Sequence, residues 1–190
     1  MEKADKPRKP RADSLRNREQ LLEAAKAVFT QNGADASLEE IARRAGVGIG
    51  TLYRHFPARG DLLAAVYQRG VDQLSAAAGA LLADRPPGEA LEAWLHLLVD
   101  YMATKRVILP ALRAVVGDDG PASSGPAIID ALNRLATAAM QAGVMRQDVT
   151  PDDLYRLLVA VSHGYDQPGW EPSARRMISI LIAGLRPLSA

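Results

Sequence analysis

Apolar residues recur every three or four positions along most of the chain, which is the spacing of an amphipathic α-helix. The first such stripe consists of Leu21, Leu22, Ala25, Val28 and Phe29. It predicts a helix over residues 14–32, which Gly33 ends because glycine accepts the left-handed conformation of a helix terminus. No segment alternates convincingly with a period of two, so we expect an all-α chain.

The same spacing predicts about nine helices in total. The remaining ranges are 38–45, 49–55, 59–83, 89–104, 106–116, 126–143, 151–164 and 171–186. Pro110 lies within the range 106–116, where it either interrupts the helix or occupies its first turn. The clearest break is Arg85-Pro86-Pro87-Gly88, and residues 117–125 and 164–169 are expected to be loops.

The segment 37–55 has the pattern of a helix-turn-helix, two short helices joined by a tight turn that contains glycine. Ser37 and Glu40 have capping-box spacing, in which the hydroxyl accepts from the Glu40 amide and the Glu40 carboxylate reaches back to the Ser37 amide. Small residues at the start of the second helix, Gly48, Gly50 and Thr51, would allow close approach to DNA and leave amides free for a phosphate.

Four side chains of this second helix can donate hydrogen bonds to phosphates or to base edges. They belong to Thr51, Tyr53, Arg54 and His55. Many helical proteins use the same geometry for packing alone, so these residues by themselves leave DNA binding and packing equally open.

Composition narrows the class of protein. The 190 residues are 48% hydrophobic and 24% charged, which is typical of a folded soluble chain. The chain has no cysteine, so disulfides, thiol catalysis and cysteine-ligated zinc are excluded. No apolar run approaches the roughly 18 residues of a membrane span. The N-terminus also lacks the apolar core of a signal peptide, so we expect a cytoplasmic protein without membrane contact.

Charge is unevenly distributed along the chain. Residues 1–60 hold 12 basic and 8 acidic side chains, whereas residues 61–190 hold 11 basic and 14 acidic ones. A basic N-terminal part suggests an anionic partner such as nucleic acid, although a solvated tail would look the same. The excess is largest in residues 1–18, whose basic side chains include Lys6, Arg8, Lys9, Arg11, Arg16 and Arg18.

Signals of catalysis are weak. His96 and Asp100 have the i, i+4 spacing of two metal ligands on one helix face, but further ligands are not visible. The sequence contains neither a GxxxxGKS phosphate loop nor a GxSxG nucleophile elbow. We therefore expect no enzyme activity, no cofactor and no metal site.

Residues 14–63 resemble the DNA-binding region of the TetR family of bacterial transcriptional regulators. The matching stretches are Leu21–Ala25 with Phe29, then Gly33, then Ser37–Val47, then Gly50–Pro57, followed by a basic residue and Leu62. The resemblance implies a flexible basic arm over 1–13, a helix-turn-helix DNA-binding domain over 14–60, and a ligand-binding and dimerisation domain over 61–190.

The resemblance also implies which residues contact DNA. They are Ser37, Leu38, Gly48, Ile49, Gly50, Thr51, Tyr53, Arg54, His55 and Arg59. Tyr53 and His55 match backbone-contacting positions, Arg54 a variable position near the bases, and Arg59 a phosphate-contacting lysine. Two residues depart from the family pattern. Gly48 replaces a frequent serine, and Gly60 replaces a frequent glutamate, which would loosen the start of the helix over 59–83.

The last two predicted helices are apolar on more than one side, which a helix wetted on one side is not. Together with the resemblance, this predicts a four-helix homodimer interface. Its candidate residues are Leu154, Leu157, Leu158, Val161, Met177, Ile180, Leu181 and Gly184. The alternative is that all of them belong to the core of one protomer.

A small-molecule pocket is expected among the helices of residues 61–190. Its candidate lining is Trp94, Leu98, Tyr101, Met102, Ile108, Leu112, Leu135 and Met140, with ordinary core packing as the alternative for each residue. Arg106 and Arg113 could meet an acidic ligand or be surface charges.

The favoured function is a homodimeric repressor that binds a palindromic double-stranded operator and is released by a small-molecule effector. One alternative is a regulator controlled by a protein partner, with a vestigial pocket. Another is a helical protein that does not bind DNA. The operator, the effector, the target genes and the direction of regulation are not determined by the sequence.

Overall fold

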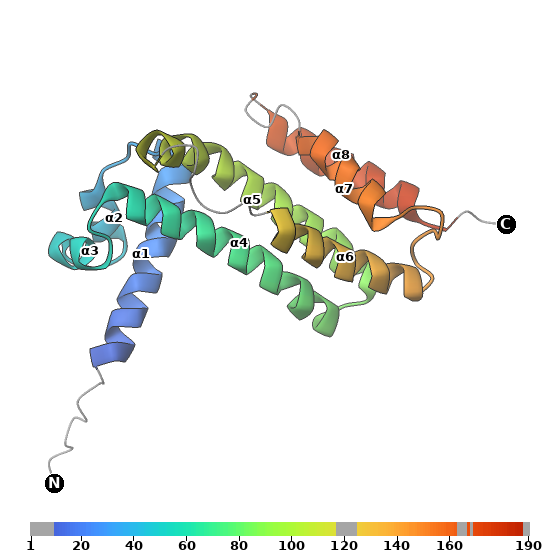
Figure 1. The fold of residues 1–190 in the computed structure, drawn as a ribbon, viewed down its shortest axis with the longest axis horizontal. Coiled ribbons are helices and arrows are strands. Elements are labelled where there is room, and N and C mark those ends of the chain that lie inside the picture. Colours follow the sequence, from blue (N-terminus) through green and yellow to red (C-terminus); the bar gives the residue numbers. More distant parts are fainter. Residues whose placement is uncertain (1–9, 117–124, 163–166, 168, 188–190) are drawn as a thin grey trace, which may run out of the picture.

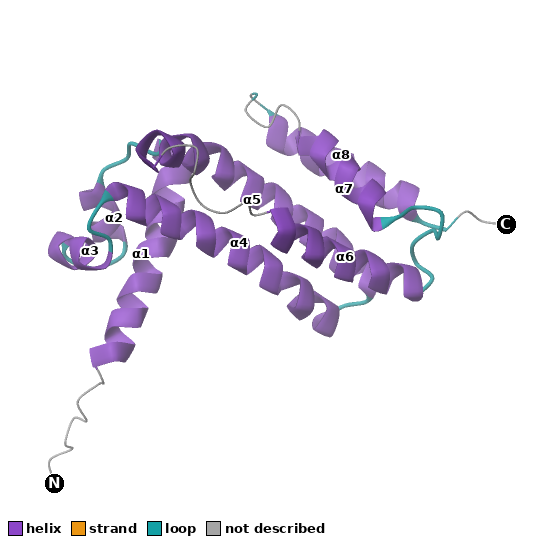
Figure 2. Cartoon of the chain, in the orientation of Figure 1, coloured by secondary structure: helices purple, strands orange, loops and turns teal. Residues whose placement is uncertain are grey.

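The apolar stripes form helices throughout the computed structural model, which describes residues 10–116, 125–162, 167 and 169–187. Every regular element within these residues is a helix, so the predicted all-α class is confirmed (Figure 2). The helices are α1 (Pro10–Asn32), α2 (Leu38–Arg44), α3 (Ile49–His55), α4 (Arg59–Asp84), α5 (Pro87–Val116), α6 (Gly125–Gln141), α7 (Pro151–Ser162) and α8 (Trp170–Leu185).

The first three helices, which we call the head, gather at one end of the molecule (Figure 1). The remaining helices, α4–α8, form the body. Helices α4 and α5 run side by side along its length, α6 packs on both, α8 packs on α5, and α7 packs on α6 and α8. Helix α1 contacts α4 and α5 as well as α2 and α3, so it belongs to the head and also touches the body.

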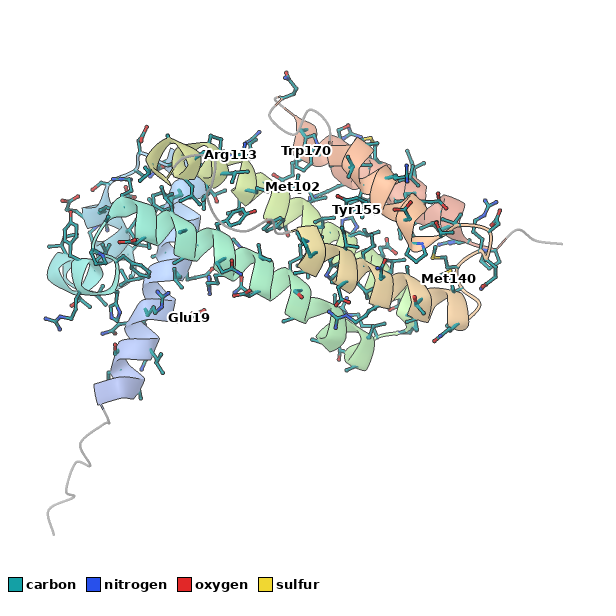
Figure 3. The ribbon with its side chains drawn as sticks, viewed as in Figure 1. Glu19, Met102, Arg113, Met140, Tyr155 and Trp170 are labelled. Atoms are coloured by element: carbon teal, nitrogen blue, oxygen red, sulfur yellow. The ribbon has the colours of Figure 1, made fainter. Side chains whose placement is uncertain are left out.

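An arginine clamp fastens α1 to α4. Arg69 of α4 donates from Nε to Glu19 at 2.9 Å and from Nη1 to Glu23 at 2.8 Å, and Figure 3 marks Glu19 on α1. Desolvation by itself lowers the pKa of the Arg69 guanidinium, but the hydrogen bonds with Glu23 and Glu19 outweigh it and raise that pKa. The pair of helices is therefore held by a cation that stays charged.

Helix α5 replaces the two helices that the sequence predicts over 89–104 and 106–116. Pro110 lies inside it on the exposed side, while Ile108 and Leu112 are buried on either side of it. A proline removes one backbone hydrogen bond from a helix. Burying two large apolar side chains contributes about 1.5–3 kcal/mol each, so packing carries the helix through the proline.

Other helix ends differ from the predicted ones by a few residues. Helix α1 begins at Pro10, four residues before the predicted start. Helix α6 ends at Gln141, two residues before the predicted end, and α7 covers Pro151–Ser162 of the described residues. Most of the two predicted loops lies outside the described residues, which omit 117–124, 163–166 and 168.

Candidate nucleic-acid interface

The turn between α2 and α3 is set by Gly46. This residue has φ +71°, a left-handed conformation that costs glycine little. Its amide donates to Arg43 O at 3.1 Å, and the next amide, of Val47, donates to Ala42 O at 3.0 Å. These two bonds make a Schellman motif, which ends α2 sharply at Arg44 and lets α3 begin at Ile49.

Ser37 caps α2 as the sequence predicts, since its Oγ accepts from the Glu40 amide at 3.3 Å. The second contact of the predicted capping box, from the Ser37 amide to the Glu40 carboxylate, is replaced by other hydrogen bonds. The Glu40 carboxylate accepts from Asn32 Nδ2 at 3.4 Å, and the Ser37 hydroxyl donates to Glu39 at 2.7 Å. This hydrogen bond from Ser37 holds the pKa of Glu39 below its ordinary value.

Helix α3 is oriented by two buried side chains, Leu52 and Phe56, which join the core of the head. Helix α3 lies at the end of the molecule (Figure 1), and side chains away from Leu52 are exposed there. Tyr53 is 46% exposed and Arg54 is also exposed, together with Ile49. The predicted DNA-contacting residues of α3 therefore share an accessible surface, although Thr51 and His55 are half-buried.

The two glycines at the start of α3 have open space where a side chain would begin. A Cβ atom built on Gly48 or on Gly50 would meet no heavy atom of the described residues within 4 Å. Neither residue has a positive φ. The absence of side chains at these positions therefore leaves a bare strip of backbone open to a partner.

Two of the predicted DNA-contacting residues have intramolecular roles. Leu38 is only 8% exposed and packs in the core of the head, so its side chain is not available at the surface. Arg59 donates from Nη1 to Ala34 O and to Ala36 O, both at 2.8 Å. This fork ties the start of α4 to the loop between α1 and α2, and only the other guanidinium nitrogens remain for a phosphate.

Gly60 does not loosen the start of α4, contrary to the sequence-based expectation. The residue is buried, and a Cβ there would lie 2.9 Å from Cγ1 of Val115, near the end of α5. Asp61 caps the helix by accepting from the Ala58 amide at 2.9 Å. Gly60 thus allows close packing of α5 against the first turn of α4, beside the head.

The basic arm is only partly within the described residues. Lys6, Arg8, Lys9 and the side chain of Arg11 lie outside them. Arg16 is exposed on α1. The Arg18 guanidinium lies 4.7 Å from the centre of the Phe56 ring, a cation–π contact that links α1 to the end of α3.

Most of the predicted ligand-binding residues are buried among the core side chains. Trp94, Leu98, Ile108, Leu112 and Leu135 are buried. Trp94 is held by its Nε1, which donates to Leu74 O at 2.8 Å. Met102 of α5 and Met140 of α6 pack against the same core (Figure 3). Tyr101 is the one member of the predicted set that lines the cavity found between α1, α4 and α5.

Arg106 and Arg113, which the sequence allows as contacts for an acidic ligand, are both exposed on α5. Neither lines the cavity between α1, α4 and α5.

The predicted dimer residues divide into two sets. Leu154 and Leu158 are buried within the protomer, and Val161 and Leu181 pack partly against its core. Met177, Ile180 and Gly184 are exposed on α8, and Leu157 is exposed on α7. Tyr155 (Figure 3) and Val159 are further exposed apolar residues of α7 that the sequence pattern does not single out.

Asp100, which has the spacing of a second metal ligand to His96 in the sequence, has another partner in the structure. The Asp100 carboxylate pairs with Arg175 of α8, and the described residues contain no group of three or more histidine, aspartate or glutamate side chains arranged to hold a metal. Within the same residues, no helix combines the length and the apolar character that crossing a bilayer requires.

Two family models match the chain. The model of the bacterial regulatory proteins of the tetR family matches residues 21–66, which cover the helix-turn-helix. The model of the SbtR-like transcriptional regulator C-terminal domain matches residues 86–187, more than half of the chain.

Solved structures and curated proteins give concordant matches. A TetR transcriptional regulator from Streptomyces coelicolor is 41% identical, with a TM-score of 0.81 over 90% of this chain and 99% of that one. A TetR regulatory protein from Mycobacterium vanbaalenii is 34% identical, with a TM-score of 0.76 over 93% and 98% of the two chains. A helix-turn-helix transcriptional regulator from Staphylococcus aureus is 41% identical over 63 residues, which span about a third of each protein, 33% and 34%.

Proposed function

This chain belongs to the TetR family of transcriptional regulators, and we propose that it is a homodimeric repressor released from its DNA operator by a small-molecule ligand. The family assignment makes it a transcriptional regulator with a helix-turn-helix DNA-binding domain. The contacting residues, the dimer, the ligand and the direction of regulation are the parts that we propose.

The outer surface of α3 is the observation that carries DNA binding. Leu52 and Phe56 anchor the helix from inside, while Tyr53, Arg54 and the bare backbone at Gly48 and Gly50 face outward. A helix presented in this way can enter a major groove, where Arg54 would contact base edges and Tyr53 would donate to a phosphate. Ile49 and Thr51 would lie at the same surface.

The outer side of α8 supports a homodimer. Met177, Ile180, Leu181 and Gly184 have the i, i+3, i+4, i+7 spacing of one helix face, and that face is largely uncovered in the protomer. Two heads joined through α7 and α8 could bind two half-sites about 34–36 Å apart, or a multiple of this distance. The operator is then expected to be palindromic.

Ligand release would operate through the junction between head and body. A ligand that binds one arrangement of the two heads more tightly than the other shifts the population towards that arrangement. The cavity between α1, α4 and α5 is suited to this coupling, since α1 belongs to the head. Helix α4, which joins head and body, would transmit the change.

The test is a DNA-binding measurement on the full chain, by fluorescence anisotropy with a fragment from its own upstream region and with DNA sites obtained by random-sequence selection. We expect Tyr53→Ala and Arg54→Ala to weaken specific binding by about tenfold or more, since a good contact is worth about 1–3 kcal/mol. Arg85→Ala is the matched control, because it removes one exposed arginine at the far end of α4.

Wild-type binding should outcompete random DNA and show two protomers per site. The logarithm of its affinity should also fall linearly with the logarithm of the salt concentration, with a slope of about one for each phosphate contact. Unchanged specific binding in both α3 variants would refute the assignment of α3. Binding to every selected sequence that is no tighter than binding to random DNA would refute the proposed function itself.

A further inference from the structure

A cavity of about 140 Å³ lies where the head meets the body. It is lined by α1, α4 and α5, and its apolar wall includes Val66, Leu74 and Leu97. The rings of Tyr67 and Tyr101 also line it, with centres 6.4 Å apart and planes tilted by 50°. An apolar cavity of about 150 Å³ can hold a benzene molecule, so this space suits a single ring or a short aliphatic chain.

The polar part of the lining carries two lysines. Lys26 comes from α1 and Lys105 from α5, where its Nζ lies 5.9 Å from the centre of the Tyr101 ring. The described residues contain no carboxylate within ion-pair distance of either lysine. Two cations without such partners, beside an apolar wall, favour an anion with an apolar body.

The carboxylates near this cavity have arginine partners. Asp100, which lines the cavity, pairs with Arg175 of α8. Glu171 accepts from the same arginine at 3.2 Å, and Glu23 accepts from Arg69 at 2.8 Å. These pairs reduce the repulsion that an anion would meet, so the lysines determine the sign of the preferred charge.

A second, more polar hollow of about 350 Å³ adjoins the cavity, and both are lined by Lys26, Asp100 and Thr104. Its other lining includes Thr30 and Gln31 of α1 and Glu171 at the start of α8. The lysine of α1 therefore stands where three helices converge: one from the head, one from the centre of the body and one carrying the proposed dimer face.

We propose that the effector of this regulator is a small monocarboxylate with an apolar body of one ring or a short chain, bound in this cavity by Lys26 and Lys105. Its regulatory meaning rests on the proposed function above. The carboxylate would bridge α1 and α5, while its body would lie between Tyr67, Tyr101 and Leu97. Leu97 is 41% exposed and would be covered by the bound ligand.

Binding at this position would act on the head directly. Gly70, which lines the cavity, directly follows Arg69, whose clamp to Glu19 and Glu23 sets α1 against α4. A ligand held between Lys26 and Lys105 adds a second tie between head and body with its own preferred spacing. DNA affinity then changes by the difference in ligand affinity for the two head positions.

The experiment is calorimetric titration of the full chain with benzoate, cyclohexanecarboxylate and hexanoate, each paired with its neutral amide. We expect at least one carboxylate to bind about tenfold or more tightly than its amide, because a hydrogen bond to a charged group contributes about 1.5–3 kcal/mol. Lys26→Met and Lys105→Met keep most of the side-chain stem and should each lose that preference.

Arg113→Met is the matched control, since it removes an exposed cation from α5 outside the cavity, and it should bind like the wild type. The melting temperature of each variant, measured without ligand, shows whether it is folded. The inference is overturned if no carboxylate binds better than its amide, or if the preference survives in both lysine variants while they remain folded.

The same carboxylates are then added to the complex with operator DNA, where the one that binds should weaken DNA affinity in the wild type and leave it unchanged in Lys26→Met. DNA affinity that does not respond to a bound carboxylate would overturn its role as effector. If the chain prefers no DNA sequence even without ligand, the proposed regulator function fails, and the calorimetric preference alone decides the cavity's specificity.

Discussion

Gly50 lowers the stability of α3, and no packing contact requires a glycine at this position. A glycine within a helix is less stable than alanine by about 0.5–1 kcal/mol, and Gly50 lies in the first turn of α3 with open space where a Cβ would be. A protein that only packed this helix would gain from a side chain here. A partner that approaches the backbone closely gives a physical reason for its absence.

Gly50→Ala is therefore expected to separate stability from binding. Unfolding by urea should show a gain of about 0.5–1 kcal/mol, while affinity for the selected operator should fall by about tenfold because the methyl group holds α3 away from the DNA. Gly79→Ala serves as control, since Gly79 is an exposed helical glycine in the body. It should bring a similar gain in stability and leave DNA affinity unchanged. An unaltered affinity in Gly50→Ala would place DNA elsewhere than at this turn.

At the scale of elements, the start of α4 and the end of α5 form one packed unit beside the head. Gly60 brings α4 against Val115, while the neighbouring Arg59 holds the loop between α1 and α2 through Ala34 and Ala36. Val115 is 58% exposed, but a β-branched valine in a helix has one strongly preferred rotamer, so turning aside costs energy. A movement of the head that shifts the start of α4 would therefore also shift the last turn of α5.

This packing predicts that Gly60→Ala destabilises the protein, although alanine is the better helix former. The new Cβ would lie 2.9 Å from Val115 Cγ1, and overpacking of this kind costs about 1–3 kcal/mol. Adding Val115→Ala removes the clash and should restore most of the lost stability in a double-mutant cycle. Gly60→Ala that is as stable as the wild type, or a loss that Val115→Ala does not relieve, would contradict the close packing of α4 on α5.

At the scale of the whole molecule, α2 and α3 lie at one end, whereas α7 and α8 lie along the half of the body away from them (Figure 1). Ile180 is 72% exposed at the centre of the α8 face. A symmetric contact at this face would place the same side chain on both sides of the twofold axis. Both copies would then be buried, and burying apolar surface contributes about 25 cal/mol per Å².

Ile180→Glu should accordingly produce monomers in analytical ultracentrifugation and weaken operator binding by at least about tenfold. The exposed position predicts that the fold survives, which circular dichroism can verify. Leu15→Glu is a matched control, because Leu15 is 70% exposed on α1 and the substitution introduces the same charge outside α7 and α8. A dimer that persists in Ile180→Glu would exclude this part of α8 from the interface.

The sequence by itself determined the elements whose causes are local. Helix periodicity, the glycine at position 46 and the Ser37 cap act over a few residues, so α2 and α3 were predicted to within one residue. The same is true of the helix-turn-helix motif, which occupies one continuous stretch. Tyr53 and Arg54, which the sequence offers as hydrogen-bond donors in that stretch, are exposed in the structure.

Only the tertiary structure decided which apolar face meets which neighbour. Periodicity shows that a face is buried, but not whether core, ligand or partner buries it, so Trp94 was expected at a pocket and lies in the core. Leu154 and Leu158 were expected in a dimer interface and are buried in the protomer for the same reason.

The partners of charged side chains and the close contacts between helices could not be predicted from the sequence either. Arg59 meets carbonyls 23 and 25 residues away, and Arg175 meets a carboxylate 75 residues away. Gly60 meets Val115 from another helix, and Pro110 is tolerated because Ile108 and Leu112 are buried beside it. These outcomes depend on the distance between segments in space, which no local pattern encodes because chain folding sets it.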